Sequence, residues 1–355
     1  MPKGLWPRSA LWVAASLALA SCATGPGTMD YQLEAIADQY VWPSPPETPR
    51  YRLVGQLIGQ PNFSRYRRPE GMGTRLLHAI VGLSSTKHLP DMLQQPQSGY
   101  VGDDGRIYVA DISKAAIFVF DPTAAKLLIW KDAGKTVQFA TPVGIAAGAN
   151  GETLVADADL KRVIRLSRDG APIGAIGAGR LERPVGIARD AERGRIFVAD
   201  AHGHDVKVFA DSGELIGTIG RRGEGDGEFN SPTYVTYARN QLYVTDTLNS
   251  RVQIFDADGK FVRQFGRRGL FVGDLPRPKG VAVDGEGNIY VVESYYDHLL
   301  VFTDDGELLL AIGGEGSSIG EFYLPAGVWT DHRNRIYVAD AFNGRVMIFQ
   351  YLGAA

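Results

Sequence analysis

Residues 223–266 read GEGDGEFNSPTYVTYARNQLYVTDTLNSRVQIFDADGKFVRQFG. Four runs rich in Val, Ile, Tyr, Phe and Thr are separated by turn residues, and these runs are TYVTYA, QLYVTD, RVQIFD and KFVRQF. β-Branched and aromatic residues favour strands, whereas Gly, Asn and Asp favour tight turns. The stretch therefore predicts four consecutive short antiparallel strands.

The same unit recurs six times along the chain. Each copy contains an apolar run that ends in an acidic residue, at Asp111, Asp157, Asp200, Asp246, Glu293 and Asp340. A proline opens each copy, at Pro96, Pro142, Pro184, Pro232, Pro278 and Pro325. Four strands in a period of roughly 40 to 50 residues are typical of one blade of a β-propeller. Helical solenoids would instead show 3.6-residue patterning, so the sequence predicts an all-β fold of six four-stranded blades.

Residues 223–266 also resemble the NHL repeat almost throughout. GVAVDGEGNIYVVE (280–293) and RIYVADAFNGRVMIF (335–349) resemble it as well. The resemblance covers about residues 96–355 and implies a six-bladed β-propeller. The first two copies depart from the repeat, since Ser98 replaces a glycine and Ala115-Ala116 replaces a polar residue followed by arginine.

The last copy ends at Tyr351 without a fourth strand. RYRLVGQLIG, residues 50–59, is similar to the fourth run of the third copy, GELIGTIG, and precedes the first copy. We therefore predict that residues 51–58 supply the outer strand of the last blade and close the ring. Closure removes an unpaired edge that would template aggregation. The predicted propeller spans residues 51–355 and contains a loop or helix insertion at residues 60–95.

Composition excludes several classes of protein. With 45% hydrophobic and 22% charged residues and no long apolar run, the chain is neither disordered nor a multi-span membrane protein. A net charge of −3 gives no electrostatic basis for binding duplex nucleic acid, so we expect no nucleic-acid partner. One cysteine excludes an intramolecular disulfide and a Cys-rich metal site. We expect a monomer.

Residues 1–21 are interpreted as an export signal. Lys3 and Arg8 precede an apolar stretch, residues 11–20, that is too short to span a bilayer. Leu19-Ala20-Ser21-Cys22 resembles the bacterial lipoprotein box, which implies lipidation at Cys22 and attachment to a membrane. Ala23 resembles the residue that accompanies sorting to the outer membrane of the cell envelope. An ordinary secretory signal with an incidental cysteine is the alternative.

Residues 22–50 are interpreted as the lipidated cysteine and a proline-rich tether. WPSPPETP, residues 42–49, predicts an extended polyproline spacer between the membrane and the propeller. We expect the tether to join the propeller on the face opposite the working loops, so that these loops point away from the membrane.

The loops divide between two faces because strands alternate in direction. If strands a to d of each blade run outward from the axis, the b–c and d–a connections share one face, which we call the loop face. The d–a connection at residues 60–95 is much longer than the others, and TRLLHAIVGL (74–83) predicts a helix within it. Long loops in compact domains are often functional.

The loop face also collects basic residues. The predicted partner-binding residues there are Arg65, Arg67, Arg68, Arg221, Arg222, Arg267, Arg268, Lys279, Glu293, Tyr295 and Tyr296. Such a surface would favour an anionic partner. A solvated rim, in which these arginines pair partly with Glu224, Asp226 and Glu228, is the alternative.

The six recurring acids are interpreted as structural. A residue present in every blade is better explained by a need of every blade, and a carboxylate after strand b can accept N–H bonds from the b–c turn. The longer side chain of Glu293 is expected not to form this cap. Since Tyr295, Tyr296 and His298 follow it, we expect the fifth copy to depart from the repeat toward function.

Five of the six histidines map to the loop face: His78, His88, His202, His204 and His298. Three imidazoles could hold zinc or iron with an open position for chemistry, and His202, His204 and His298 are the candidate ligands. Against a metal site, His202 and His298 belong to blades that are not neighbours. His204 occupies a position where the NHL pattern itself often carries Asn or His.

Two functions remain open because propellers support both binding and catalysis. The first is a lipid-anchored module of the bacterial envelope that needs no cofactor and binds an envelope protein or an anionic glycan through its loop face. The second is a metal-dependent enzyme, with Zn, Fe or Ca near the propeller axis, similar to amidoglycolate lyases or lactonases. The chain shows no nucleophile elbow and no phosphate-binding loop.

Overall fold

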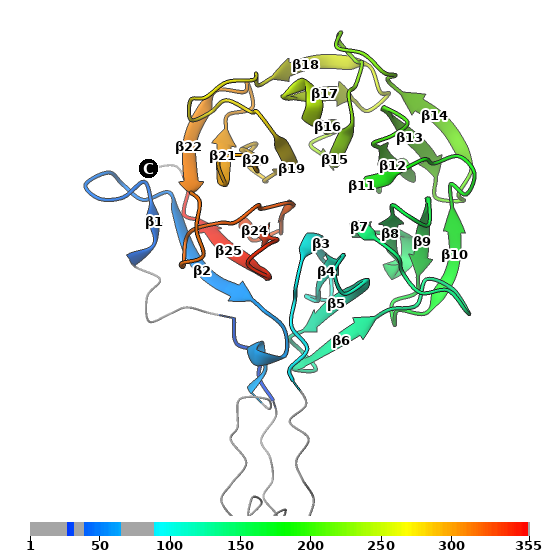
Figure 1. Cartoon of the computed structure of the whole chain (residues 1–355), viewed down its shortest axis with the longest axis horizontal. Helices are drawn as coiled ribbons and strands as arrows, with labels where there is room; N and C mark the ends of the chain where they lie inside the picture. Colours follow the sequence, from blue (N-terminus) through cyan, green and yellow to red (C-terminus); the bar gives the residue numbers. More distant parts are fainter. Residues whose placement is uncertain (1–26, 32–38, 65–88, 354–355) are drawn as a thin grey trace, which may run out of the picture.

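The computed structural model describes residues 27–31, 39–64 and 89–353. Six antiparallel sheets are arranged as blades around a central axis, which confirms the predicted six-bladed β-propeller (Figure 1). Each of blades 1 to 5 contains four consecutive strands, a to d from the axis outward.

The strand bounds follow the repeats. Blade 1 contains β3 (Pro96–Val101), β4 (Ile107–Asp111), β5 (Ala116–Asp121) and β6 (Lys126–Trp130), and blade 2 contains β7 (Pro142–Ala147), β8 (Thr153–Asp157), β9 (Arg162–Leu166) and β10 (Pro172–Ile176). Blade 3 contains β11 (Pro184–Asp190), β12 (Arg195–Asp200), β13 (Asp205–Ala210) and β14 (Leu215–Ile219), and blade 4 contains β15 (Pro232–Ala238), β16 (Gln241–Asp246), β17 (Arg251–Asp256) and β18 (Phe261–Phe265). Blade 5 contains β19 (Pro278–Val283), β20 (Ile289–Glu293), β21 (His298–Phe302) and β22 (Leu308–Gly313).

The last blade closes the ring with the N-terminal strand, as predicted. Its strands β23 (Val328–Thr330), β24 (Arg335–Asp340) and β25 (Arg345–Tyr351) are followed outward by β2 (Tyr51–Leu57). β2 pairs antiparallel with β25, from Tyr51 opposite Tyr351 to Leu57 opposite Val346. Chain segments from the two ends of the propeller thus share one sheet (Figure 1).

A fifth strand, which the sequence analysis did not predict, extends this blade. β1 (Val41–Trp42) pairs with β2, and the Trp42 ring packs edge-on against Phe349 with 5.5 Å between ring centroids. The Arg50 amide donates a hydrogen bond to the Trp42 carbonyl (2.7 Å), so the chain reverses between β1 and β2. The predicted extended spacer over residues 42–49 is therefore wrong, because this segment is the turn of a hairpin.

Residues 27–31 lie beside the end of β2 that reaches the loop face. The Ser64 amide donates to the Thr28 carbonyl and the Gln56 amide donates to the Tyr31 carbonyl, each at 2.9 Å. This segment therefore lies at the loop-face end of the outer edge. The chain enters β2 at Tyr51 from the opposite face, as expected. The earlier residues 27–31 nevertheless lie at the loop-face end of β2, where backbone bonds hold them.

Several predicted features lie outside the described residues. They are the signal sequence, the lipidation site Cys22, the helix expected at residues 74–83, the partner-binding residues Arg65, Arg67 and Arg68, and the histidines His78 and His88.

The core consists of six apolar clusters, one between each pair of adjacent blades. β24 shows why the b strands are apolar without alternation. Ile336 and Val338 pack toward blade 5, whereas Tyr337 and Ala339 pack toward blade 1. A strand buried on both faces has no solvent side, so every position favours an apolar residue.

Glycines allow the innermost strands of neighbouring blades to approach closely. Gly144, Gly280 and Gly327 each lie two residues after the proline that opens the copy. A Cβ atom added at Gly327 would lie 2.2 Å from the Gln97 carbonyl oxygen of the next blade. At Gly144 the corresponding distance to the Val185 carbonyl oxygen is 2.3 Å, so a side chain at either position would separate the blades at the axis.

Gly327→Ala should therefore lower the free energy of unfolding by about 1–3 kcal/mol, because the new methyl group meets backbone that cannot yield without moving a blade. Gly174→Ala is the matched control, since its nearest atom would be 3.9 Å away in the outer strand β10. It should change stability by less than ~0.5 kcal/mol. Chemical denaturation of both variants measures the difference, and equal losses would contradict the close-approach argument.

Candidate functional site

The acid that ends each b strand joins two loops of the loop face. Asp157 accepts hydrogen bonds from the amides of Thr141 (3.0 Å) and Ala140 (2.8 Å) in the d–a connection. It also accepts from the amide of Leu160 (3.0 Å) in the b–c turn. Asp111 and Asp200 make the same two sets of bonds. The structural interpretation of these acids is confirmed. Besides the predicted b–c turn, they also bind the d–a connection.

Glu293 forms the same cap, so the prediction that it could not is wrong. Its carboxylate accepts hydrogen bonds from the amides of Arg277 (2.9 Å), Tyr295 (3.0 Å) and Tyr296 (2.8 Å). The extra methylene still leaves both oxygens facing the donors. Glu293 is 1% exposed, so as a predicted partner-binding residue it can act only by fixing the loops around it.

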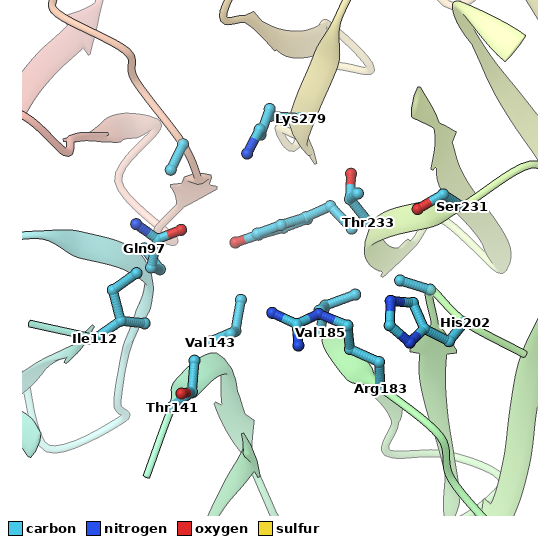
Figure 2. Close-up of a pocket in the computed structure, with 13 residues that line it drawn as sticks. Gln97, Ile112, Thr141, Val143, Arg183, Val185, His202, Ser231, Thr233 and Lys279 are labelled. Atoms are coloured by element: carbon cyan, nitrogen blue, oxygen red, sulfur yellow. The ribbon is translucent and has the colours of Figure 1, made fainter. Parts of the chain in front are cut away.

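These caps fix the residues on either side of each strand-opening proline, and those residues line a cavity on the axis. The cavity has a volume of about 250 Å³. The residue after the proline lines it in all six blades: Gln97, Val143, Val185, Thr233, Lys279 and Ala326. Other lining residues come from the d–a and b–c connections: Ile112, Thr141, Arg183, Ala201, His202 and Ser231 (Figure 2).

Tyr234 replaces the axial glycine in blade 4 and also lines the cavity. Its hydroxyl donates a hydrogen bond to the Val328 carbonyl of blade 6 (3.3 Å), so the side chain crosses the axis. Burial raises the pKa of Tyr234, which keeps the hydroxyl protonated as a donor. Tyr234 thus contributes a wall to the cavity where a glycine would leave open space.

The cavity lining is basic. Arg183, His202 and Lys279 line it, and none of the described lining residues is Asp or Glu. Arg183 forms a salt bridge with Asp159 (3.3 Å), whose other oxygen accepts a hydrogen bond from the Thr141 hydroxyl (2.6 Å). Among the described residues the Lys279 amine has no hydrogen-bond or ion-pair partner. Burial first, and then the charge of Arg277, lowers the pKa of Lys279.

Of the seven predicted loop arginines the structure describes four, and two of these are paired within their own loops. Arg221 contacts Glu228 and Arg267 contacts Asp274, each at 2.8 Å. This is the solvated-rim arrangement, and exposed pairs of this kind contribute little energy. Arg222 and Arg268 are exposed, with no side-chain bond to the rest of the described chain.

A neighbouring apolar loop escaped the sequence analysis. Leu270, Phe271 and Val272 are 80%, 76% and 63% exposed at the tip of the d–a connection that leads into blade 5. The loop sequence GRRGLFVGDL (266–275) aligns without a gap with GRRGEGDGEF (220–229) of the preceding blade. Both loops keep an Arg–acid pair and a buried apolar residue at the end, so only the tip has changed from polar to apolar. Comparing the d–a loops with one another would have revealed it.

Further exposed rings lie on the loops that follow. Tyr295 is 63% exposed and packs edge-on against Tyr296, with 4.9 Å between centroids. In blade 6, Tyr323 and Phe342 form a second edge-on pair at 5.8 Å. The Leu324 amide donates to Asp297 (2.9 Å) and so ties the two loops together. We call Leu270, Phe271, Val272, Tyr295, Tyr323 and Phe342 the apolar loop patch.

The candidate metal ligands do not come together. His202 lines the axial cavity, His204 Nδ1 accepts a hydrogen bond from the Ser231 amide (3.1 Å), and His298 lies beneath the apolar loop beside Leu270. In the part of the chain that the structure describes, no three His, Cys, Asp or Glu side chains form a metal-binding group. The three candidate ligands of the alternative function therefore lie in different environments.

No helix in the described residues is both long enough and apolar enough to cross a membrane.

The six four-stranded blades make this protein a six-bladed β-propeller. Residues 275–353 match the model of a family described as "6-bladed beta-propeller" (DUF5128). NHL-repeat-containing protein 4 of Homo sapiens is 36% identical over 77 residues, which are 22% of this chain and 61% of the human protein. The matched region thus spans less than two thirds of that relative.

Solved structures agree with the fold. A protein of unknown function from Bacteroides thetaiotaomicron is 16% identical with a TM-score of 0.55, over 73% of this chain and 70% of that one. Virginiamycin B lyase from Staphylococcus aureus is 14% identical with a TM-score of 0.54, over 73% of this chain and 96% of the lyase. At these identities the likeness concerns the fold alone.

Asp157→Asn should lower the free energy of unfolding by about 1–3 kcal/mol, because an amide nitrogen would face backbone N–H donors that now bond to a carboxylate. Asp169→Asn is the control, since Asp169 is exposed in a c–d turn. Thermal and chemical unfolding measure the effect. Two variants of equal stability would contradict the structural role of the acid.

Proposed function

We propose that this protein is a binding module of the bacterial envelope that holds a protein partner on its apolar loop patch. The observation that carries the proposal is the exposed tip Leu270-Phe271-Val272 on a loop that is polar in the preceding blade. Burying such side chains on binding gains about 1.5–3 kcal/mol for each that becomes fully enclosed. Contiguous exposed apolar surface commonly marks an interaction site.

The chemistry of the patch favours a protein over an anionic glycan. Leu270 and Val272 are aliphatic, so the tip of the loop offers an anionic glycan neither a charge nor a side-chain hydrogen-bond donor. Interface centres in proteins are enriched in aromatic residues and Arg, and here Tyr295, Tyr323 and Phe342 accompany the exposed Arg268. A partner with an apolar pocket and an acidic rim would fit this surface.

The sequence before residue 27 supports a lipid anchor at Cys22. Cys22 lies five positions before Gly27, a reach of ~17 Å when the chain is fully extended. Because residues 27–31 lie against the end of β2, we propose a short attachment that keeps the propeller close to the membrane. Ala23 favours the outer membrane as the destination.

A photo-crosslinking residue in place of Phe271 should give a specific protein adduct in intact envelopes. Leu270→Ser combined with Val272→Ser should reduce that adduct at least tenfold, because the apolar contact is lost. The same probe at Ile216, a 50% exposed apolar residue on the outer strand β14, is the control and should give no specific adduct.

Gel analysis with protease and glycosidase treatment identifies the captured material. An adduct that only glycosidase removes would replace the protein partner by a glycan. Equal adducts from positions 216 and 271 would exclude the apolar loop patch as the binding surface.

Cys22→Ser should abolish lipid labelling and release the protein from the membrane fraction, because the serine hydroxyl cannot replace the thiolate that carries the lipid. Metabolic labelling with a fatty acid, followed by fractionation, measures both effects. Labelling of the Cys22→Ser variant at the parental level would exclude the anchor at this residue.

A further inference from the structure

Lys279 holds a position at the axis where every other blade has an uncharged residue. The equivalent residues are Gln97, Val143, Val185, Thr233 and Ala326. Lys279 is half-buried, and no described side chain pairs with its amine. A charge withdrawn from water without a partner costs free energy, and protein interiors normally supply a counter-charge. The described part of the cavity wall supplies no such counter-charge.

We propose that the axial cavity binds the carboxylate of a small monoanion, with Lys279 as its ion-pair partner. This site is distinct from the apolar loop patch and does not depend on the protein partner proposed above.

The groups around Lys279 are arranged to hold such an anion. Lys279, Gln97 and Arg183 line the same cavity from three different blades (Figure 2). Arg183 uses one nitrogen for Asp159, which leaves its other N–H groups as donors. A carboxylate beside the Lys279 amine would receive a charge-assisted hydrogen bond, which is about twice as strong as a neutral one.

The walls and the size of the cavity restrict the rest of the ligand. Ile112, Val143 and Val185 present apolar surface, so the body attached to the carboxylate should be aliphatic or aromatic. About 250 Å³ is slightly less than the usual range for a ligand pocket and suits a small molecule or one terminal residue of a chain. Because Lys279 has no ion-pair partner among the described residues whereas Arg183 already pairs with Asp159, a monoanion matches the remaining charge better than a phosphate dianion.

Two sources could supply this chemistry: a free carboxylic acid, or the C-terminal carboxylate of a polypeptide. Isothermal titration calorimetry of the mature chain distinguishes them with four probes. Isobutyrate and phenylacetate represent free acids, a tetrapeptide ending in valine represents the polypeptide, and inorganic phosphate tests the dianion. Isobutyramide, phenylacetamide and the amidated tetrapeptide are the uncharged counterparts.

At least one carboxylate should bind saturably, and its amide should bind at least tenfold more weakly. Lys279→Met should weaken the carboxylate at least tenfold. Lys260→Met is the matched control, since Lys260 is exposed in a c–d turn outside the cavity lining, and it should leave the affinity unchanged. Affinity should fall as pH rises through the lowered pKa of Lys279, before an ordinary lysine would deprotonate.

Lys279→Met should fold, because it removes a poorly solvated charge. A lysine whose pKa is lowered in the folded state destabilises that state below this pKa, and the penalty fades as pH rises toward the unfolded value. The variant should therefore unfold at no lower a temperature than the parent at pH 7. Lys279→Gln gives a second test if the methionine variant misfolds, and it should lose carboxylate binding as well.

Several results would overturn the proposal. The first two are equal affinity for an acid and its amide, and unchanged affinity in a folded Lys279→Met or Lys279→Gln variant. The other two are tighter binding of phosphate than of every carboxylate, and no binding of any probe at millimolar concentration. Binding of the tetrapeptide acid without the free acids would support the site and identify its ligand as a chain terminus.

Discussion

The structure depends on a buried carboxylate repeated once in each blade. In blades 1, 2, 3 and 5 it bonds to backbone amides of both the following b–c turn and the preceding d–a connection. Blades 4 and 6 use a variation, in which Asp246 and Asp340 accept one loop amide and bind Asn249 or Asn343 together with Arg251 or Arg345. The b–c turn and the d–a connection are thereby both hydrogen-bonded to the end of one b strand. These bonds hold the loops of the loop face in place on the sheets.

The packing of the blades explains which positions of the repeat keep the same residue and which positions differ between blades. The glycine two residues after the opening proline lies against the backbone of the next blade. Ser98 and Tyr234 replace this glycine in blades 1 and 4, and their hydroxyls donate hydrogen bonds to the carbonyls of Val143 and Val328. The residue between proline and glycine lines the axial cavity, and it varies in size and charge from blade to blade. The loop tips also vary, because Arg267, Asp274 and Leu275 hold the base of the loop whatever the residues at its tip.

The sequence by itself determined the number of blades, the four-stranded unit and the closing strand, because each is encoded in a local pattern that repeats. The structural role of the acids followed from the same logic, since a need common to all blades produces a common residue. It also assigned each connection to one of two faces, because successive strands alternate in direction.

Only the tertiary structure decided which residues meet. In the sequence Lys279 is one of many basic residues. In the structure it lines a cavity to which all six blades contribute, and the residues around it come from positions 97 to 326. Three further features depend on contacts that a local pattern does not contain. They are the separation of His202, His204 and His298, the hairpin formed by residues 41–52, and the cap in which the Glu293 carboxylate reaches the amides of two loops. A local sequence pattern does not predict these contacts. It indicates the periodicity of one strand, whereas the neighbours of that strand are determined only when the ring closes.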